Sequence, residues 1–269
     1  MDDSTIFLGA VAYDPKVVTI WEGMRAHFHD LGVPMDFALF SNYERQIETL
    51  LKGHIDIAWN TPLAHVRVRH HTGGKSLSLG MRDSDCGFRS KIVVRKDAGI
   101  RSLGDLHQKT LAVGSRDSTQ ARILPLYFLR QQGIDLSRVN VLAFDTDLGK
   151  HGDTGTSELD VLAALHDGRA QAGTVGDLIW AGEQSAGRID AGKIEVLWTT
   201  PGFDHCMFDA MPDLPKEKLE GFRRALFAMR WDVPGHRRLM ELEGLREWVP
   251  PREEGYQSLV AALAETESL

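Results

Sequence analysis

The sequence predicts an α/β protein built from one large or two medium-sized domains. Its 269 residues, of which 42% are hydrophobic, are enough to bury a substantial core. Short β-rich runs alternate along the chain with amphipathic stretches of helical length, which is typical of repeated strand–helix units. Such units predict parallel sheets flanked by helices, with ligands bound where strands end and loops lead into helices.

Strand-like and helical runs alternate through the first hundred residues. Val18, Trp21, Met24 and Phe28 share one helical face, and Gly32 is a typical helix terminator. We expect strands at 5–13, 35–40, 55–60 and 90–97, and helices at 17–31 and 42–53.

The same alternation continues as far as Thr200 and then gives way to helices. Strands are expected at 109–114, 139–145, 171–177 and 194–200, and helices at 124–133, 157–168 and 177–187. Beyond Pro212, amphipathic stretches at 216–231, 235–243 and 255–265 predict helices.

Polar or unusual residues occupy four loops that lie between an expected strand and the next helix. These loops are residues 12–15, 59–62, 117–120 and 152–158. Ser, Thr and Asp cap helix starts by accepting free backbone N–H groups, and the same unpaired N–H groups, with the helix dipole, attract anions. A single loop of this kind is ordinarily a cap, but four together suggest a binding site for a small anionic ligand.

The bulk properties limit the partners and the location of the protein. A net charge of −7 and an isoelectric point of about 5.9 give no indication of nucleic-acid binding. The apolar runs are too short to span a bilayer, so no membrane insertion is expected. The N-terminal residues do not resemble a secretory signal, so the chain is expected to be cytoplasmic as it stands, or periplasmic if Met1 replaces a removed export signal. Cys86 and Cys206 are expected to be free thiols, with a single bridge as the alternative.

Five segments follow one another in an order that carries a family resemblance. They are GHIDIAWNTPLAH, FRSKIVVRKDAGIRSLGDLHQKTLAV, STQARILP, SELDVLAALHDGRAQAGTVGD and WTTPGFDHCMFDAMPDLP. The first segment is similar to the motif G-x-V-D-x-A-W-x-G-P, and the second to D-S-G-I followed by D-L-K-G-K. The third is similar to S-T-S-G with a later proline. The fourth is similar to H-E-A-A followed by G-x-V-D-A, and the fifth to T-S-P followed by D-L-P. Together they resemble the phosphonate/phosphite-binding family of periplasmic solute-binding proteins that serve ABC transporters.

The resemblance implies a type 2 periplasmic-binding-protein fold, in which two α/β lobes joined by two crossovers close on a ligand. Lobe one would comprise residues 1–95 and 198–269, and lobe two residues 96–197. The crossovers would lie near Val94–Lys96 and Leu197–Thr199. The implied function is to bind a small anionic solute (phosphonate-like, oxyanion or carboxylate) between the lobes, for an ABC transporter permease or a sensor protein.

The resemblance also points to individual ligand-binding residues. Ser118 and Thr119 match the family's first two anion-binding hydroxyls, and Glu158 matches a ligand-facing acid. Four positions of this sequence depart from the family pattern. Gln120 replaces the family's third hydroxyl, Ser157 replaces a His, and Phe88 replaces a Tyr. Gly176 replaces an Asp, and Asp177 follows it directly. Because the amine-recognising acids are only partly present, aminoethylphosphonate is not the expected ligand.

The remaining candidates lie on the polar loops or beside the return crossover. Tyr13 follows the first strand, and Trp59 either stacks on a ligand or packs in the core. Asn60 and Thr61 either offer donors to a ligand or cap the next helix. The full ligand-binding set expected is Tyr13, Trp59, Asn60, Thr61, Ser118, Thr119, Gln120, His151, Thr156, Ser157, Glu158, Asp177 and His205.

A cytosolic enzyme on the same scaffold is the main alternative, because a fold does not fix a function. It would use lyase or decarboxylase chemistry, with Glu158, His205 and Cys206 as candidate catalytic residues. A cytosolic ligand sensor is a third possibility. No cofactor is expected, because the nucleotide-binding and hydrolase motifs are absent. No metal site is expected either, and the histidine pairs of residues 27–29 and 70–71 lack a partner pattern for zinc.

Overall fold

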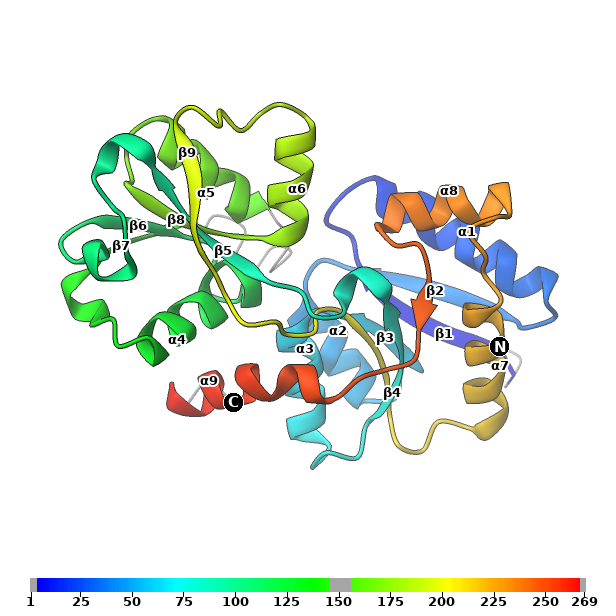
Figure 1. Cartoon of the computed structure of the whole chain (residues 1–269). Coiled ribbons are helices and arrows are strands. Elements are labelled where there is room, and N and C mark those ends of the chain that lie inside the picture. Colours follow the sequence, from blue (N-terminus) through cyan, green and yellow to red (C-terminus); the bar gives the residue numbers. More distant parts are fainter. Residues whose placement is uncertain (1–3, 146–155, 267–269) are drawn as a thin grey trace. The chain divides into compact units, whose positions relative to one another are not determined.

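Two sheets organise the chain, and each belongs to a separate unit. The computed structural model describes residues 4–145 and 156–266. Within that part, the first unit comprises residues 4–87 and 204–257, and the second unit comprises residues 88–145, 156–203 and 258–266. The chain therefore enters the second unit after Gly87, leaves it after Phe203 and returns after Gln257 (Figure 1).

The first unit contains a mixed six-stranded sheet in the order β11-β4-β10-β3-β1-β2. Its strands are β1 (Ile6–Val11), β2 (Met35–Phe40), β3 (Ile57–Asn60), β4 (Leu77–Arg82), β10 (Met207–Ala210) and β11 (Trp248–Val249). β1 is parallel to β2 and β3, whereas β10 is antiparallel to both β3 and β4. As a result, β1, β3 and β4 all end at the same edge of the sheet, where β10 begins.

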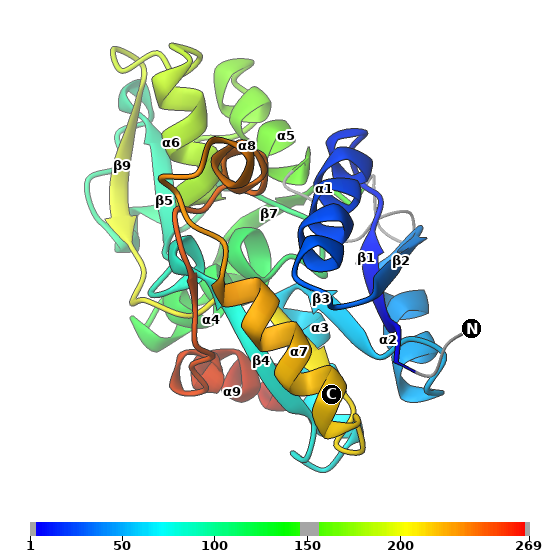
Figure 2. The same cartoon turned by 90° about the vertical axis from the view of Figure 1, so that its right-hand side faces the viewer.

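Helices cover both faces of this first sheet. They are α1 (Lys16–Asp30), α2 (Tyr43–Leu51), α3 (Pro62–His71), α7 (Lys216–Phe227) and α8 (Pro234–Glu243). On one face, Phe28 of α1 and Phe222 of α7 pack with Phe208 of β10, and Figure 2 shows α7 running alongside β4. On the other face, Leu50 of α2 packs with Val68 of α3. The two cores alternate along the strands, as the period of two residues in a strand requires.

The second unit contains a mixed five-stranded sheet in the order β7-β6-β8-β5-β9. Its strands are β5 (Ser90–Arg95), β6 (Thr110–Val113), β7 (Asn140–Ala143), β8 (Ala172–Gly176) and β9 (Ile194–Thr199). β6 is parallel to β7 and β8, and β5 is antiparallel to β8 and β9.

The helices of the second unit lie on opposite faces of its sheet (Figure 1). They are α4 (Leu124–Gln131), α5 (Thr156–His166), α6 (Asp177–Ser185) and the C-terminal α9 (Gln257–Glu265). Leu129 of α4 belongs to one core, and Val161 of α5 with Trp180 of α6 belongs to the other. Contacts assign residues 258–266 of the C-terminal segment to this unit, and Arg130 of α4 pairs with Glu265 of α9 at 3.0 Å. No helix in the described ranges is long and apolar enough to cross a membrane.

The predicted alternation of strands and helices is present, but three features differ from expectation. β4, β10 and β11 were not predicted, and because of the reversed strands β5, β10 and β11 both sheets are mixed rather than parallel. The expected crossovers near Val94–Lys96 and Leu197–Thr199 fall at paired ends of β5 and β9, which hydrogen-bond to each other inside the second sheet. The chain changes unit instead after Gly87 and after Phe203, so the units differ from the expected lobes.

Gln108, in the turn before β6, is the only non-glycine residue with a positive φ among the described residues, at 62°. The D-L-K-G-K motif of the resembled family has glycine at this position. We expect Gln108→Gly to raise the free energy of unfolding by about 0.5–1 kcal/mol, because only glycine adopts this conformation without steric cost. Chemical denaturation measures the change. As a control, Gln184→Gly in α6 should lower stability by about 1 kcal/mol, and a loss at both positions would contradict the assignment.

Candidate ligand-binding site

Polar residues gather at the edge of the second sheet where β6 and β8 end. These strands are parallel, so the loops after Val113 and Gly176 leave the sheet at the same edge. β5 begins there, with Ser90 paired opposite Gly176. The edge thus brings together segments that are far apart in the sequence, within a single unit.

Ser118 organises the turn that leads from β6 into α4. Its carbonyl oxygen accepts the N–H groups of Arg122 and Ile123, and its Oγ accepts the N–H of Ala121 at 3.1 Å. Residues Thr119–Ile123 form a π-helical turn before α4. The expectation that unpaired amides face an anion therefore does not hold for these three amides. The Ser118 hydroxyl accepts in this arrangement and keeps its O–H to donate.

Glu158, in the first turn of α5, is a buried acid at this edge. It is 1% exposed, and its Oε1 accepts the Gly176 N–H at 2.6 Å. Its Oε2 accepts the side-chain amide of Gln120 at 3.0 Å. Burial raises the pKa of Glu158, and these two hydrogen bonds oppose that rise. Both carboxylate oxygens are therefore bonded to neutral donors within the protein.

Phe88, Gln120 and Gly176, which all depart from the resembled family, pack against one another. A Cβ atom at Gly176 would lie 2.9 Å from two ring carbons of Phe88 and 3.0 Å from Cγ of Gln120. An aspartate at this position would therefore collide with its neighbours. The three departures from the family are therefore related: the Phe88 ring and the Gln120 side chain occupy the space that a side chain at position 176 would need.

We expect Gly176→Ala to lower the free energy of unfolding by about 1–3 kcal/mol, because it overpacks a filled site. The backbone φ of −82° is open to any residue, so the effect is steric. Gly182→Ala in α6 is the matched control, since nothing lies within 4 Å of its added Cβ. That control should gain about 0.5–1 kcal/mol from helix propensity, and chemical denaturation measures both changes. Equal effects at the two positions would contradict the packing argument.

The other candidates of the second unit have varied surroundings. Thr156 is exposed and Ser157 is buried. Asp177 forms an ion pair with Lys91 and accepts the backbone N–H of Arg89 at 3.0 Å, so its carboxylate is committed to β5. Thr119 is fully buried next to Ser118. His151 lies outside the described residues.

In the first unit, the candidates at the end of β3 and directly after it have structural partners. Trp59 packs on Phe208, with ring centroids 4.3 Å apart, so its side chain belongs to the core. Asn60 donates to Asp209 and accepts from Gln46, both at 2.8 Å. The Thr61 hydroxyl accepts the Ala64 N–H at 3.5 Å and caps α3.

Arg82 and Asp85 form a buried ion pair at the edge of the first sheet where β4 ends. This pair was not predicted from the sequence. The Arg82 Nε and Nη2 atoms each donate to Asp85 at 2.7 Å, and Nη1 donates to the Glu243 carbonyl, also at 2.7 Å. Burial alone would raise the pKa of Asp85, but the Arg82 guanidinium outweighs it and lowers the pKa to about 2. The Asp85 carboxylate likewise raises the pKa of Arg82, against the effect of burial. Through its bond to Glu243, Arg82 also joins the end of β4 to the last residue of α8.

Tyr13, His205 and Cys206 lie around this ion pair. Tyr13 is 37% exposed, and partial burial together with the Glu243 carboxylate raises the pKa of its phenol. The His205 Nδ1 lies 3.2 Å from the Cys206 Sγ and 3.5 Å from Asp85 Oδ1. Cys86 and Cys206 are both free thiols, as the sequence favoured, and burial raises the pKa of Cys86.

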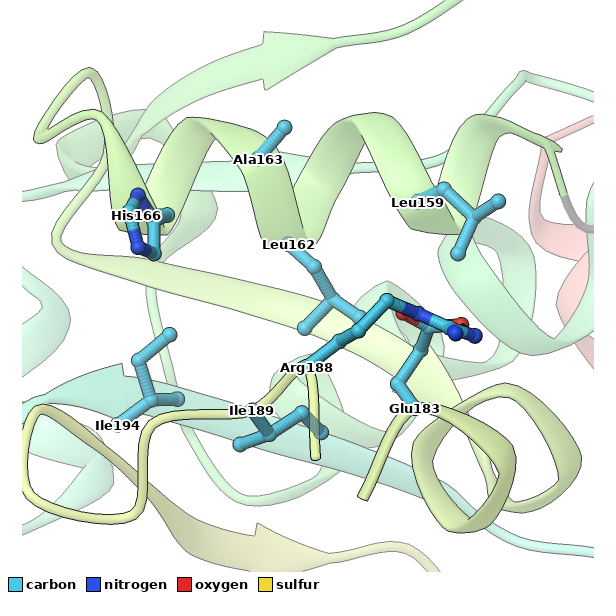
Figure 3. A pocket seen from close by; sticks show the side chains of 8 residues that line it. All are labelled: Leu159, Leu162, Ala163, His166, Glu183, Arg188, Ile189 and Ile194. Carbon is cyan, nitrogen blue, oxygen red and sulfur yellow. Dashed lines mark hydrogen bonds and ion pairs between the residues drawn. The ribbon is translucent and has the colours of Figure 1, made fainter. Parts of the chain in front are cut away.

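A separate hollow of about 510 Å³ lies in the second unit between α5 and the segment from α6 to β9. Its lining is Leu159, Leu162, Ala163, His166, Glu183, Arg188, Ile189 and Ile194 (Figure 3). Glu183 and Arg188 form an ion pair beside its aliphatic side chains. The hollow contains none of the predicted ligand-binding residues, and its lining is largely apolar.

Comparison with known proteins places the chain in a family. The model of the periplasmic substrate-binding proteins of phosphonate ABC transporters matches residues 10–256. The chain belongs to this phosphonate-binding family. The resemblance noted from the sequence is thereby confirmed, and so is the role as the substrate-binding component of an ABC transporter. The comparisons give no support to the cytosolic enzyme alternative.

Individual relatives of this family member are distant in sequence. It is 23% identical over 239 residues to a probable ABC transporter phosphite-binding protein, PhnD1, of Prochlorococcus marinus strain MIT 9301, covering 85% of this chain and 77% of that protein. The solved structure of PhnD1 with methylphosphonate matches over 99% of both chains, with a TM-score of 0.77 and 19% identity. XAC2383 of Xanthomonas citri bound to ATP matches over 98% of both chains, with a TM-score of 0.75 and 17% identity. These structures confirm the predicted type 2 fold.

Proposed function

We propose that this family member binds a small tetrahedral oxyanion of the phosphite or methylphosphonate type, without an ammonium group, and delivers it to an ABC transporter permease. The ligand would contact Ser118 and Thr119 at the end of β6. Both side chains are fully buried, and hydrogen bonds from hydroxyls to an anion are strongest where water is excluded.

The observation that carries the choice of ligand is the arrangement around Glu158. An ammonium group needs a carboxylate with free acceptor capacity and a net negative charge nearby. Here the Glu158 oxygens already accept from Gln120 and Gly176, and Asp177 is paired with Lys91. The Gly176 position has no room for an additional acid. The acids described at this edge therefore already have partners, which disfavours an ammonium group on the ligand.

The relatives support the same ligand class, since PhnD1 is named as a phosphite-binding protein and has been solved with methylphosphonate. Membership of a periplasmic family supports export of this chain and contact with a membrane permease. Thr156 and Ser157 remain proposed ligand contacts on this edge. His151, which lies outside the described residues, and Tyr13 and His205 of the first unit remain contacts proposed from the sequence alone.

Thermal unfolding with a panel of phosphite, methylphosphonate, phosphate, methanesulfonate and 2-aminoethylphosphonate tests the proposal. A ligand at 100 times its dissociation constant should raise the free energy of unfolding by about 2.7 kcal/mol. We expect phosphite or methylphosphonate to bind at least tenfold more tightly than 2-aminoethylphosphonate. Tighter binding of the aminophosphonate would contradict the proposal.

A further inference from the structure

We propose that His205 and Cys206, with Asp85 as a third donor, form a binding site for a soft monovalent metal ion, Cu(I). The site goes beyond the proposed oxyanion binding: its three donors lie in the first unit, whereas the hydroxyls of Ser118 and Thr119 that would hold the oxyanion lie in the second. His205, Cys206 and Asp85 each offer one ligand atom, and these atoms all lie within 4.8 Å of one another.

The spacing of the donors suits a single small ion. The His205 Nδ1 is 3.2 Å from the Cys206 Sγ and 3.5 Å from Asp85 Oδ1. With the bond lengths of about 2.0 Å to nitrogen and 2.3 Å to sulfur that are typical of zinc sites, two ligands of one ion lie about 3.5 Å apart at a tetrahedral angle and about 3.7 Å apart at the trigonal angle of a three-coordinate ion. The imidazole therefore stands between a sulfur and an oxygen donor at distances that a shared ion would bridge with small adjustments.

The backbone around the three donors is held in place. The His205 N–H donates to the Asp85 carbonyl at 2.9 Å, and the Tyr256 hydroxyl donates to the His205 carbonyl at 2.7 Å. Met207, directly after Cys206, starts β10 and pairs with Asn60 of β3. All three donor residues are buried, so little ordering would be needed when the ion binds.

The charges nearby favour a monovalent ion over a divalent one. The Arg82 guanidinium is bonded to both oxygens of Asp85, so this carboxylate is already neutralised and can serve only as a weak third ligand. A thiolate and an imidazole with Cu(I) form a group of zero net charge, whereas a divalent ion would leave a positive charge beside Arg82. Thiolate and imidazole are also the donors that Cu(I) prefers.

The binding step is a simple exchange without oxidation or reduction. Cu(I) bonds to the Sγ of Cys206 and to the Nδ1 of His205, and the thiol proton is released to water. The remaining imidazole proton then resides on Nε2. A supply of Cu(I), kept reduced by an external reductant such as ascorbate, is the only requirement.

The test is anaerobic titration of the complete protein with Cu(I) in competition with a chromophoric Cu(I) chelator. We expect one Cu(I) per chain in the wild type and in Cys86→Ser, which alters the other thiol. Cys206→Ser and His205→Gln should bind at least tenfold more weakly, with their folding checked by thermal unfolding. Zn(II) should bind the wild type at least tenfold more weakly than Cu(I).

A second measurement uses the unmodified chain and does not depend on any variant. Because Cys206 is only 8% exposed, its slow modification by excess N-ethylmaleimide is followed over hours by mass spectrometry. Equimolar Cu(I) should slow the modification of Cys206 at least tenfold and leave the rate at Cys86 unchanged. Undiminished Cu(I) binding in Cys206→Ser, protection of Cys86 alone, or tighter binding of Zn(II) would each overturn the proposal. Oxyanion binding is measured separately and should be unchanged in Cys206→Ser, so failure of one proposal is distinguishable from failure of the other.

Discussion

The double variant Ser118→Ala, Thr119→Val is expected to lose the thermal stabilisation that phosphite or methylphosphonate gives to the wild type. A hydrogen bond to a charged group contributes about 1.5–3 kcal/mol, so each hydroxyl should account for roughly a tenfold to hundredfold change in the dissociation constant. Loss of both should therefore bring binding below detection at millimolar ligand. Isothermal titration calorimetry and thermal unfolding with the same ligands measure the effect.

The two substitutions also have different effects on the protein without ligand. The Ser118 Oγ accepts the Ala121 N–H, so Ser118→Ala should lower the free energy of unfolding by about 1 kcal/mol through loss of this cap. Thr119→Val keeps the shape of the side chain and isolates the effect of the hydroxyl on binding. Thr49→Val, the same change at a half-buried position of α2 in the other unit, where the hydroxyl donates to the Arg45 carbonyl at 2.7 Å, is the control. Full ligand stabilisation in the double variant would remove this edge as the binding site.

Arg82→Met is expected to lower the free energy of unfolding of the first unit by about 3–5 kcal/mol, because it leaves the Asp85 carboxylate buried without its partner. Asp85 is fully buried and Arg82 is nearly so. The same change also removes the hydrogen bond to the Glu243 carbonyl at the end of α8. Hydrogen exchange measured by mass spectrometry should show the loss in peptides from β3 and β4 and leave peptides from β6 protected.

Arg230→Met is the matched control for this prediction, because Arg230 pairs with Asp232 on the surface, where both side chains are mostly exposed. Exposed ion pairs contribute about 0–1 kcal/mol, so the control should unfold almost as the wild type does. Adding Asp85→Asn to Arg82→Met should recover part of the loss, since it removes the orphaned charge. Similar losses at Arg82 and Arg230 would contradict the importance of burial.

The same ion pair makes stability depend on acid. Because the pKa of Asp85 is lowered to about 2, its ionised form stabilises the folded state above the ordinary pKa of 3.8, and this contribution is lost as the pH falls through about 2. The difference corresponds to about 2 kcal/mol. In Arg82→Met the pKa of Asp85 should rise, so acid unfolding should begin at a higher pH than in the wild type.

Local sequence patterns were sufficient for most of the secondary structure. The helical spacing of Trp21, Met24 and Phe28 depends only on neighbouring residues, and α1 forms where that spacing predicts it. Asn42 was expected at the start of the second helix, and it caps α2 by accepting the Arg45 N–H. Such signals are local, because the chain within one or two turns contains all the partners.

Strands whose partners are distant in sequence were harder to predict. β4 contains Ser78 and Gly80, which weaken a strand pattern, and it is held by antiparallel pairing with β10 far along the chain. β10 itself is only four residues long and lies beside Pro212, where the sequence suggested only helix. Arg82, at the end of β4, was therefore missed together with the strand that positions it.

Short motifs and local periodicity were enough to predict the family, the alternation of strands and helices, and the loop that contains Ser118 and Thr119. The partners of the buried polar groups became known from the three-dimensional fold: Glu158 with Gln120 and Gly176, and Arg82 with Asp85 and Glu243. These groups come from separate strands and helices. Their charges and hydrogen bonds are fixed by which segments the sheets bring to one edge, and no local pattern encodes that pairing.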